Sequence, residues 1–244
     1  MDHADVWDEA AAAAYDAPGA GMFAPDLLAA TVMHLKALAA GGAALEFAVG
    51  TGRVAIPLQA AGVPVSGIEL SAPMVARLRA KTGSGMPVVI GDMATARMPG
   101  QFTLVYLVYN TISNLLTQAE QIACFRNAAR HLAPGGAFVI ELWVPQLPPP
   151  PPAPQAVVGL SEPGYLLVDV FEVATQQVVS HHVRFEGGGG VSLFRTPHRY
   201  VRPTELDLLA QIAGFQLERR EADWQGRPFD ATSRSHISVY RLPG

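Results

Sequence analysis

The chain has 244 residues, of which 50% are apolar and 16% are charged, and its formal net charge is −4. This length predicts one large domain or one domain with a sizeable insertion, and the single cysteine excludes a disulfide framework or a cysteine-based zinc cluster. The mildly acidic balance argues against nucleic acid or an anionic membrane as a partner. No apolar stretch approaches the ~20 residues of a membrane-spanning helix, and residues 1–10 lack the features of a secretory signal. We therefore expect a cytoplasmic protein.

The first half of the chain favours an α/β fold. Helical patterns cover 7–16 and 25–42, with a connector over 17–25. From residue 43, short apolar runs alternate with amphipathic segments, as strand–helix units do. The predicted strands cover 43–49, 63–70, 86–93, 101–110 and 137–144. The predicted helices lie within 51–62, 72–81 and 118–136, and Pro134-Gly135-Gly136 closes the last of them. This repetition predicts a doubly wound, mostly parallel sheet that helices cover on both faces.

The regular order ends after the fifth strand. A proline run over 146–155 predicts a semi-rigid connector, with a ligand for a proline-binding domain as the alternative. Three β-rich runs follow without helices and predict an antiparallel meander. These runs cover 165–176, 177–186 and 191–201. The last segments predict a helix over 202–215 with Thr204 as its N-cap, and closing strands over 215–224 and 235–242.

We therefore expect one α/β domain, formed by 1–147 and 202–244, that carries an insertion over 148–201. The β-rich runs are apolar on much of both strand faces, so they should pack against something. The insertion is expected either to cover the active site or to join two subunits as a homodimer.

The turn after the first predicted strand carries the sharpest functional signal. Small residues at Ala48, Gly50 and Gly52 allow the backbone to turn tightly and to approach a ligand. A helix that starts here would direct its free N–H groups at that ligand. The dinucleotide pattern G-x-G-x-x-G fails at Ala48 and at Arg53, and no Lys-Ser/Thr pair follows as in a triphosphate-binding loop.

Two acidic residues at later strand ends extend this signal. Glu69 ends the second predicted strand, where a carboxylate can accept hydrogen bonds from both hydroxyls of a ribose. Asp92, within Gly91-Asp92-Met93 after the third predicted strand, can accept from an exocyclic amine of a purine. The structural alternatives are a solvated strand-end carboxylate for Glu69 and a turn-forming Gly-Asp pair for Asp92.

These motifs together resemble those of the class I S-adenosylmethionine-dependent methyltransferases. LEFAVGTGR resembles the first motif of that family, GIELSAPMVARL the acidic motif, and GDM the adenine-side motif. The resemblance covers residues 43–144, and 202–240 more loosely. The wider layout is similar to bacterial enzymes of secondary metabolism, including sugar N-methyltransferases with a β-rich insertion. It implies a seven-stranded Rossmann-like fold and N- or O-methylation of a small molecule. A nicotinamide-dependent oxidoreductase and a non-catalytic cofactor-binding protein are the alternatives.

The resemblance also implies a set of cofactor-binding residues. Residues of the first motif would frame the methionine moiety of the cofactor. Residues of the acidic motif would hold its ribose, and those of the GDM motif would hold its adenine. Tyr15 resembles an aromatic residue that closes over the cofactor, although it could equally pack against a helix. The implied residues are Tyr15, Glu46, Ala48, Gly50, Thr51, Gly52, Arg53, Glu69, Leu70, Met74, Gly91, Asp92, Met93, Tyr109 and Asn110.

Catalysis requires mainly that a nucleophile be aligned behind the methyl group, and an amine or phenol also needs a group that takes its proton. The candidates are Tyr109, His181, His182 and His198. Strand alternation places His181 and His182 on opposite faces, so at most one of them faces the cleft directly. Each histidine could instead be an ordinary strand-surface residue. No spacing brings two histidines to one helical face, so we expect no metal.

Overall fold

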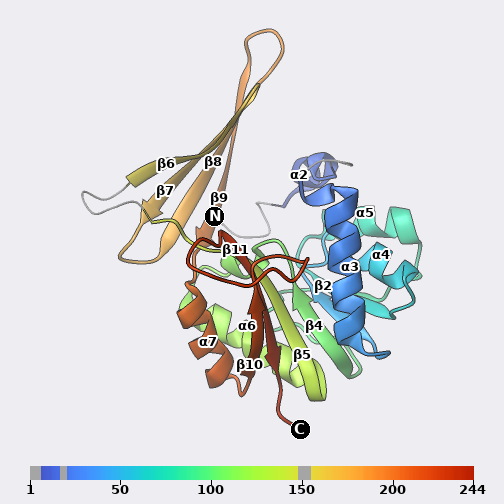
Figure 1. Ribbon diagram of the computed structural model, residues 1–244. Coiled ribbons are helices and arrows are strands. Elements are labelled where there is room, and N and C mark those ends of the chain that lie inside the picture. The colour runs from blue at the N-terminus through green and yellow to red at the C-terminus, as the bar shows by residue number, and fades with distance from the viewer. Residues whose placement is uncertain (1–6, 17–20, 148–154) are drawn as a thin grey trace.

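The computed structural model describes residues 7–16, 21–147 and 155–244, so the predicted connectors over 17–25 and 146–155 lie partly outside the described residues. A seven-stranded sheet forms the centre of the molecule, in the order β10-β11-β5-β4-β1-β2-β3 (Figure 1). Its strands are β1 Ala44–Phe47, β2 Val65–Glu69, β3 Val88–Ile90, β4 Phe102–Leu107, β5 Leu132–Trp143, β10 Gln216–Glu221 and β11 Ser235–Arg241. β1 to β5 pair in parallel, whereas β11 runs antiparallel to β5 and to β10. The predicted, mostly parallel seven-stranded sheet is confirmed.

Helices cover both faces of this sheet because its central strands are apolar on both sides. Leu45 and Phe47 of β1 pack in the cluster that includes side chains of α6 and α7, whereas Ala44 packs in the cluster formed with α3, α4 and α5. The helices are α2 Glu9–Ala14, α3 Pro25–Ala39, α4 Ala55–Ala60, α5 Ala72–Thr82, α6 Gln118–His131 and α7 Pro203–Ile212, with short 3-10 turns η1 Gly21–Phe23 and η2 Thr111–Asn114. Within the described ranges, none of these helices has the length and apolarity that a membrane span requires.

Two predicted helix starts are wrong, and proline explains each. The end of α6 at His131 agrees with the predicted stop at Pro134, which disfavours helical backbone in the residue before it. α4 starts at Ala55 rather than at 51, because Pro57 is tolerated only in the first turn of a helix. The free N–H groups of that helix therefore do not begin at the glycine turn. The N-cap of α7 is Arg202 rather than Thr204, because Pro203 takes the first helical position.

The inserted segment forms a separate antiparallel sheet that projects away from the main body (Figure 1). It has the order β6-β7-β8-β9, with bounds β6 Gln155–Glu162, β7 Tyr165–Glu172, β8 Gln177–Phe185 and β9 Val191–Arg199. We call this the insertion sheet. The sequence predicts three of its strands and misses β6. The register of β6 shifts between Val158 and Leu160, and this bulge interrupts the alternation by which a strand is recognised.

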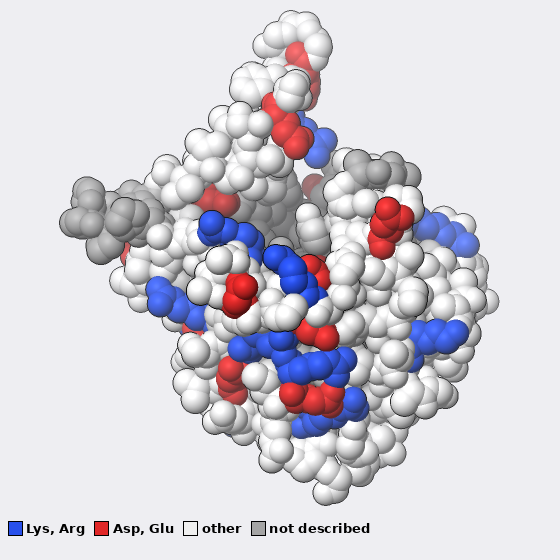
Figure 2. Space-filling view, viewed as in Figure 1, with Lys and Arg blue, Asp and Glu red and all other residues white. Residues whose placement is uncertain are grey.

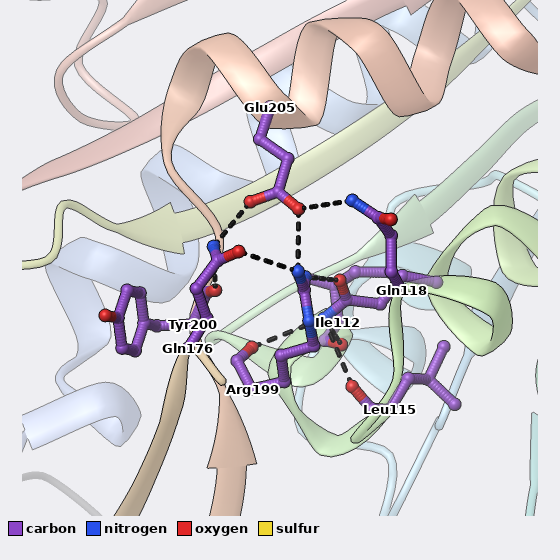
Figure 3. A network of polar contacts seen from close by, with 8 residues as sticks. Ile112, Leu115, Gln118, Gln176, Arg199, Tyr200 and Glu205 are labelled. Carbon is purple, nitrogen blue, oxygen red and sulfur yellow. Dashed lines mark hydrogen bonds and ion pairs between the residues drawn. The ribbon is translucent and has the colours of Figure 1, made fainter. Parts of the chain in front are cut away.

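A buried polar network fastens the insertion sheet to the helices (Figure 3). Arg199, at the end of β9, forms an ion pair with Glu205 of α7 at 2.7 Å. The Arg199 guanidinium also donates to Gln121 Oε1 of α6 at 2.6 Å and to Gln176 Oε1 at 2.9 Å. Gln176 lies in the turn between β7 and β8, and it donates to the Glu205 carboxylate as well. Two separate parts of the insertion are thus held at one point on the main domain.

Candidate active site

A cavity of about 920 Å³ lies between the carboxyl ends of the parallel strands and one face of the insertion sheet. The surface is hollowed between the projecting sheet and the region of α2 (Figure 2). In doubly wound sheets, ligands bind at this edge, where strand order reverses. Ala48, Glu69 and Asp92 line the cavity from the main sheet, and His182 and Thr196 line it from the insertion sheet.

The turn after β1 has the tight backbone that its sequence predicts. Ala48 and Gly50 have φ of 52° and 55°, in the left-handed region that alanine adopts only at a cost. Gly52 has φ of 86°, and a Cβ there would lie 2.4 Å from Leu78 Cδ1. Gly52 does not line the cavity, and its close packing against Leu78 of α5 explains why a glycine is needed at this position. Its predicted role in framing the cofactor stays a prediction.

Glu69, at the end of β2, is the best-ordered acidic group at this edge. Its Oε2 accepts from the Gly50 backbone N–H and its Oε1 accepts from the Ser71 backbone N–H, both at 2.8 Å. Burial raises the pKa of Glu69, and the backbone donors oppose this shift. The carboxylate lines the cavity with Leu70 and Met74 beside it. This arrangement joins the first turn to the second and leaves each carboxylate oxygen a further lone pair as acceptor.

The turn after β3 completes this edge. Asp92 Oδ1 accepts from the Ala94 backbone N–H at 2.7 Å, which fixes the side chain in the cavity wall. Gly91 and Met93 line the cavity next to it. Three turns that are far apart in sequence therefore meet at one site, as parallel strands with aligned carboxyl ends require.

Glu46 lies deeper, beside a smaller cavity of about 30 Å³ that Thr51 and Arg53 also line. Tyr106 donates from its hydroxyl to Glu46 Oε2 at 2.9 Å. Burial raises the pKa of Glu46 to about 8, and the Tyr106 hydrogen bond and the Arg53 charge oppose this shift. At neutral pH the ligand-free protein therefore holds Glu46 mainly as a neutral carboxyl group, which an arriving cation would ionise.

The N-terminal segment covers this smaller cavity. Tyr15 is half-buried, its ring centroid lies 5.7 Å from that of Trp7 and 6.1 Å from that of Phe23, and it lines both cavities. Burial raises the pKa of Tyr15 to about 12, so it stays a neutral phenol. Next to it, Asp16 accepts from Thr51 Oγ1 at 2.6 Å and pairs with Lys81 at 2.7 Å. Tyr15 thus packs against aromatic neighbours and also lines the site, and its closing over the cofactor stays a prediction.

The turn after β4 carries Tyr109 and Asn110, and both have positive φ, at 54° and 66°. Three groups of β5 hold this turn. Glu141 Oε2 accepts from the Tyr109 N–H at 2.7 Å, the Glu141 carbonyl accepts from the Asn110 N–H, and the Trp143 N–H donates to Asn110 Oδ1. Glu141 Oε1 also accepts from Trp224 Nε1 at 2.9 Å. The strained turn is thus held from β5, and Trp224 ties it to the segment before β11.

The insertion sheet contributes a polar wall to the cavity. Tyr165 OH lies 2.6 Å from His182 Nδ1, and Thr196 Oγ1 lies 3.1 Å from His182 Nε2 and 3.0 Å from His198 Nε2. Burial lowers the pKa of His182, while Asp169 raises it. His182 is therefore a neutral imidazole near pH 7, held between a phenol and a hydroxyl.

The structure separates the catalytic candidates. His182, His198 and Tyr109 line the cavity, whereas His181 does not, since it lies on the other face of β8. Trp143, Asp169 and Tyr165 also line the cavity, and no sequence motif marks them as site residues. Alternation groups Tyr165 with Asp169 on one face of β7, but only the pairing of β7 with β8 shows that this face meets His182.

Comparison with known proteins agrees with this geometry. A family model described as a methyltransferase domain matches residues 44–136. The structure of the CcbJ methyltransferase from Streptomyces caelestis is 36% identical, with 100% of both chains covered and a TM-score of 0.87. The cypemycin N-terminal methyltransferase of a Streptomyces species is 28% identical over 98% of each chain. The dTDP-4-amino-2,3,4,6-tetradeoxy-D-glucose N,N-dimethyltransferase of Saccharopolyspora spinosa is 32% identical over 58% of this chain and 55% of its own.

The chain therefore belongs to the S-adenosylmethionine-dependent methyltransferases. The predicted family, Rossmann-like fold, activity and cofactor are confirmed, and nothing supports the nicotinamide or the non-catalytic alternative.

Proposed function

We propose that this enzyme methylates an amine nitrogen of a small molecule in secondary metabolism. The observation that carries the proposal is the single cavity of about 920 Å³ that joins the cofactor edge to a wall bearing neutral His182. One relative is named as the N-terminal methyltransferase of cypemycin, and another as an N,N-dimethyltransferase of a dTDP-linked amino sugar. An amine loses a proton when it is methylated, and a neutral imidazole is the kind of group that takes it.

The residues at the cofactor edge fit S-adenosylmethionine, which supplies an activated methyl group when bound. We assign Glu69 to the ribose hydroxyls, because its carboxylate is already oriented by Gly50 and Ser71. Asp92 and Met93 would contact the adenine, and the buried Glu46 would pair with the ammonium group of the methionine part. A buried carboxyl of raised pKa suits a cationic partner, whose charge compensates for the burial.

His182 would act through Tyr165 in this proposal. With Tyr165 donating to Nδ1 at 2.6 Å, the Nε2–H of His182 donates to Thr196, which fixes the tautomer. The phenol oxygen of Tyr165 would receive the proton of the amine as its own proton moves to His182 Nδ1. Asp169 faces the resulting imidazolium and stabilises it, while Arg184 and His181 act in the opposite direction.

The experiment compares His182→Asn with His181→Asn, because His181 is the adjacent imidazole on the opposite face of β8. S-adenosylhomocysteine formation would be measured with a panel of small amines and a matched panel of alcohols. We expect His182→Asn to lower kcat by about 10²-fold or more, with unchanged cofactor affinity, and His181→Asn to leave kcat near wild type. Transfer to alcohols but not to amines would overturn the proposal, and so would a wild-type kcat in His182→Asn.

We also propose that the outer face of the insertion sheet binds a second copy of the chain. This face, opposite the cavity, exposes Val158, Phe185, Val191 and Leu193. Several exposed aliphatic and aromatic side chains on one sheet face are typical of interaction surfaces. Light scattering after size-exclusion chromatography should give a dimer that Leu193→Asp converts to a monomer. A monomeric wild-type protein would refute this.

A further inference from the structure

The charges around the cavity are strongly asymmetric. Arginine and lysine contribute a single residue to its described lining, Arg184, whereas aspartate and glutamate contribute several. The acidic lining residues are Asp8, Glu69, Asp92, Glu120 and Asp169. Sites that bind a diphosphate use several arginines or lysines, or open backbone N–H groups. This cavity has the opposite balance.

One of the long helices whose first turn borders the cavity, α6, is not available to an anion. Thr117 and Glu120 form a capping box at the start of α6, in which Glu120 Oε2 accepts from the Thr117 backbone N–H at 2.9 Å. The carboxylate of Glu120 therefore already neutralises the positive end of this helix. A phosphate placed there would meet a negative charge rather than free donors.

Asp169 differs from the other acids because it lies on the substrate side of the cavity. Glu69 and Asp92 stand at the cofactor edge, and Asp8 caps α2. Asp169 stands on β7 of the insertion sheet, and its Oδ1 accepts from Ser180 Oγ at 2.6 Å. No described group donates to its Oδ2, which a Cβ at Gly159 would approach to 2.9 Å. A glycine at the β6 bulge thus leaves room for this carboxylate.

Asp169 also lies one step along the strands from the proton-transfer group. Asp169 pairs with Ser180, and Leu167 pairs with His182, in the register of β7 with β8. Residues 165, 167 and 169 of β7 follow one another on one face of the strand, with neighbouring residues about 7 Å apart. A substrate amine near Tyr165 and His182 could therefore place a neighbouring donor group against Asp169.

We infer that the substrate is a phosphate-free amine whose ammonium or hydroxyl donors bind the Asp169 carboxylate. This rests on the proposed N-methylation and narrows its substrate class. It separates this enzyme from relatives whose names specify a dTDP-linked sugar, since such a substrate would bring two phosphates into an acidic cavity. The reaction that supplies the substrate must accordingly leave the amine without a nucleotide, as a glycosyl transfer or a hydrolysis does.

The test uses three probes on the enzyme loaded with S-adenosylhomocysteine: glucosamine, glucosamine 1-phosphate and thymidine diphosphate. The first two differ only by the phosphate. Calorimetry should show glucosamine binding at least tenfold more tightly than its phosphate, and no binding of thymidine diphosphate. Asp169→Asn, which keeps an acceptor for Ser180, should weaken glucosamine binding about ten- to a hundredfold, as loss of a charge-assisted hydrogen bond does. Glu172→Gln, on the other face of β7, is the matched control.

Each other outcome counts against the inference. Equal or tighter binding of the phosphorylated probes, abolished by Arg184→Ala, would mean that the site accepts nucleotide-linked substrates. No binding of any probe, or binding unaffected by Asp169→Asn, would remove Asp169 as the substrate contact. Thermal unfolding and S-adenosylhomocysteine affinity of Asp169→Asn show whether the variant is folded. The proposed methyl transfer to amines fails separately, by the turnover assay with His182→Asn.

Discussion

Glu69 offers the sharpest test of the cofactor edge, because both of its oxygens accept backbone hydrogen bonds. Oε2 accepts from the Gly50 N–H and Oε1 from the Ser71 N–H, each at 2.8 Å. In Glu69→Gln, one oxygen becomes an NH₂ group that must face a backbone N–H. The isosteric amide should therefore perform nearly as poorly as Glu69→Ala. A lost charge-assisted hydrogen bond costs about 1.5–3 kcal/mol, which corresponds to about 10- to 150-fold in affinity.

Calorimetric titration with S-adenosylhomocysteine measures the loss of affinity directly. Thermal unfolding without ligand shows whether the substitution also destabilises the free protein. Glu172→Gln serves as the control, since it removes an exposed carboxylate from the far face of β7. Unchanged affinity in a folded Glu69→Ala protein would remove Glu69 from the cofactor site. A Glu69→Gln protein with wild-type affinity would show that the two backbone hydrogen bonds do not organise the site.

Three further predictions concern other buried polar groups. Burial raises the pKa of Glu46 to about 8, so cofactor binding near neutral pH should release a proton, and the affinity should rise with pH up to about that value and level off above it. Calorimetry in two buffers detects the released proton, and Glu46→Gln should abolish it. Burial alone would raise the pKa of Glu205, but its hydrogen bonds, including that from Arg199, hold this pKa below its ordinary value. The ionised Glu205 therefore stabilises the fold at pH values above its ordinary pKa, and this stabilisation is lost as the pH falls through the lowered pKa. Arg199→Met should lower the free energy of unfolding in urea by about 3–5 kcal/mol, and the double variant with Glu205→Gln by less. Glu141→Gln and Trp224→Phe should lower kcat while leaving S-adenosylhomocysteine affinity near wild type, because both hold the turn after β4; equal losses of kcat and affinity would contradict that role.

The cofactor edge could be predicted from sequence because its signals are local. Each lies at the end of an apolar strand, and parallel strands bring such ends together whatever the details of packing. Gly50, Glu69 and Asp92 can each be recognised from the few residues next to them in the sequence. Gly52 shows the limit of this reasoning, since its small size serves contact with Leu78 rather than the cavity lining.

The substrate wall could not be predicted in the same way. Which residues of β7, β8 and β9 share a face follows from strand register, and register depends on turns and a bulge rather than on any one strand. Alternation correctly separates His181 from His182, but it cannot tell which of them faces the cleft. The Asp169–Ser180 contact and the Tyr165–His182 contact both join different strands.

The exceptions to ordinary folding rules cluster at the proposed site, and this clustering is itself an argument for it. Burial raises the pKa of both Glu46 and Glu69, so the ligand-free fold disfavours the charged form of each carboxyl group. Ala48, Tyr109 and Asn110 adopt left-handed backbone that a glycine would adopt at less cost. Strain and buried charge together mark positions where the sequence departs from what the fold alone favours. The cofactor that ionises Glu46 and occupies these turns would compensate for part of that cost.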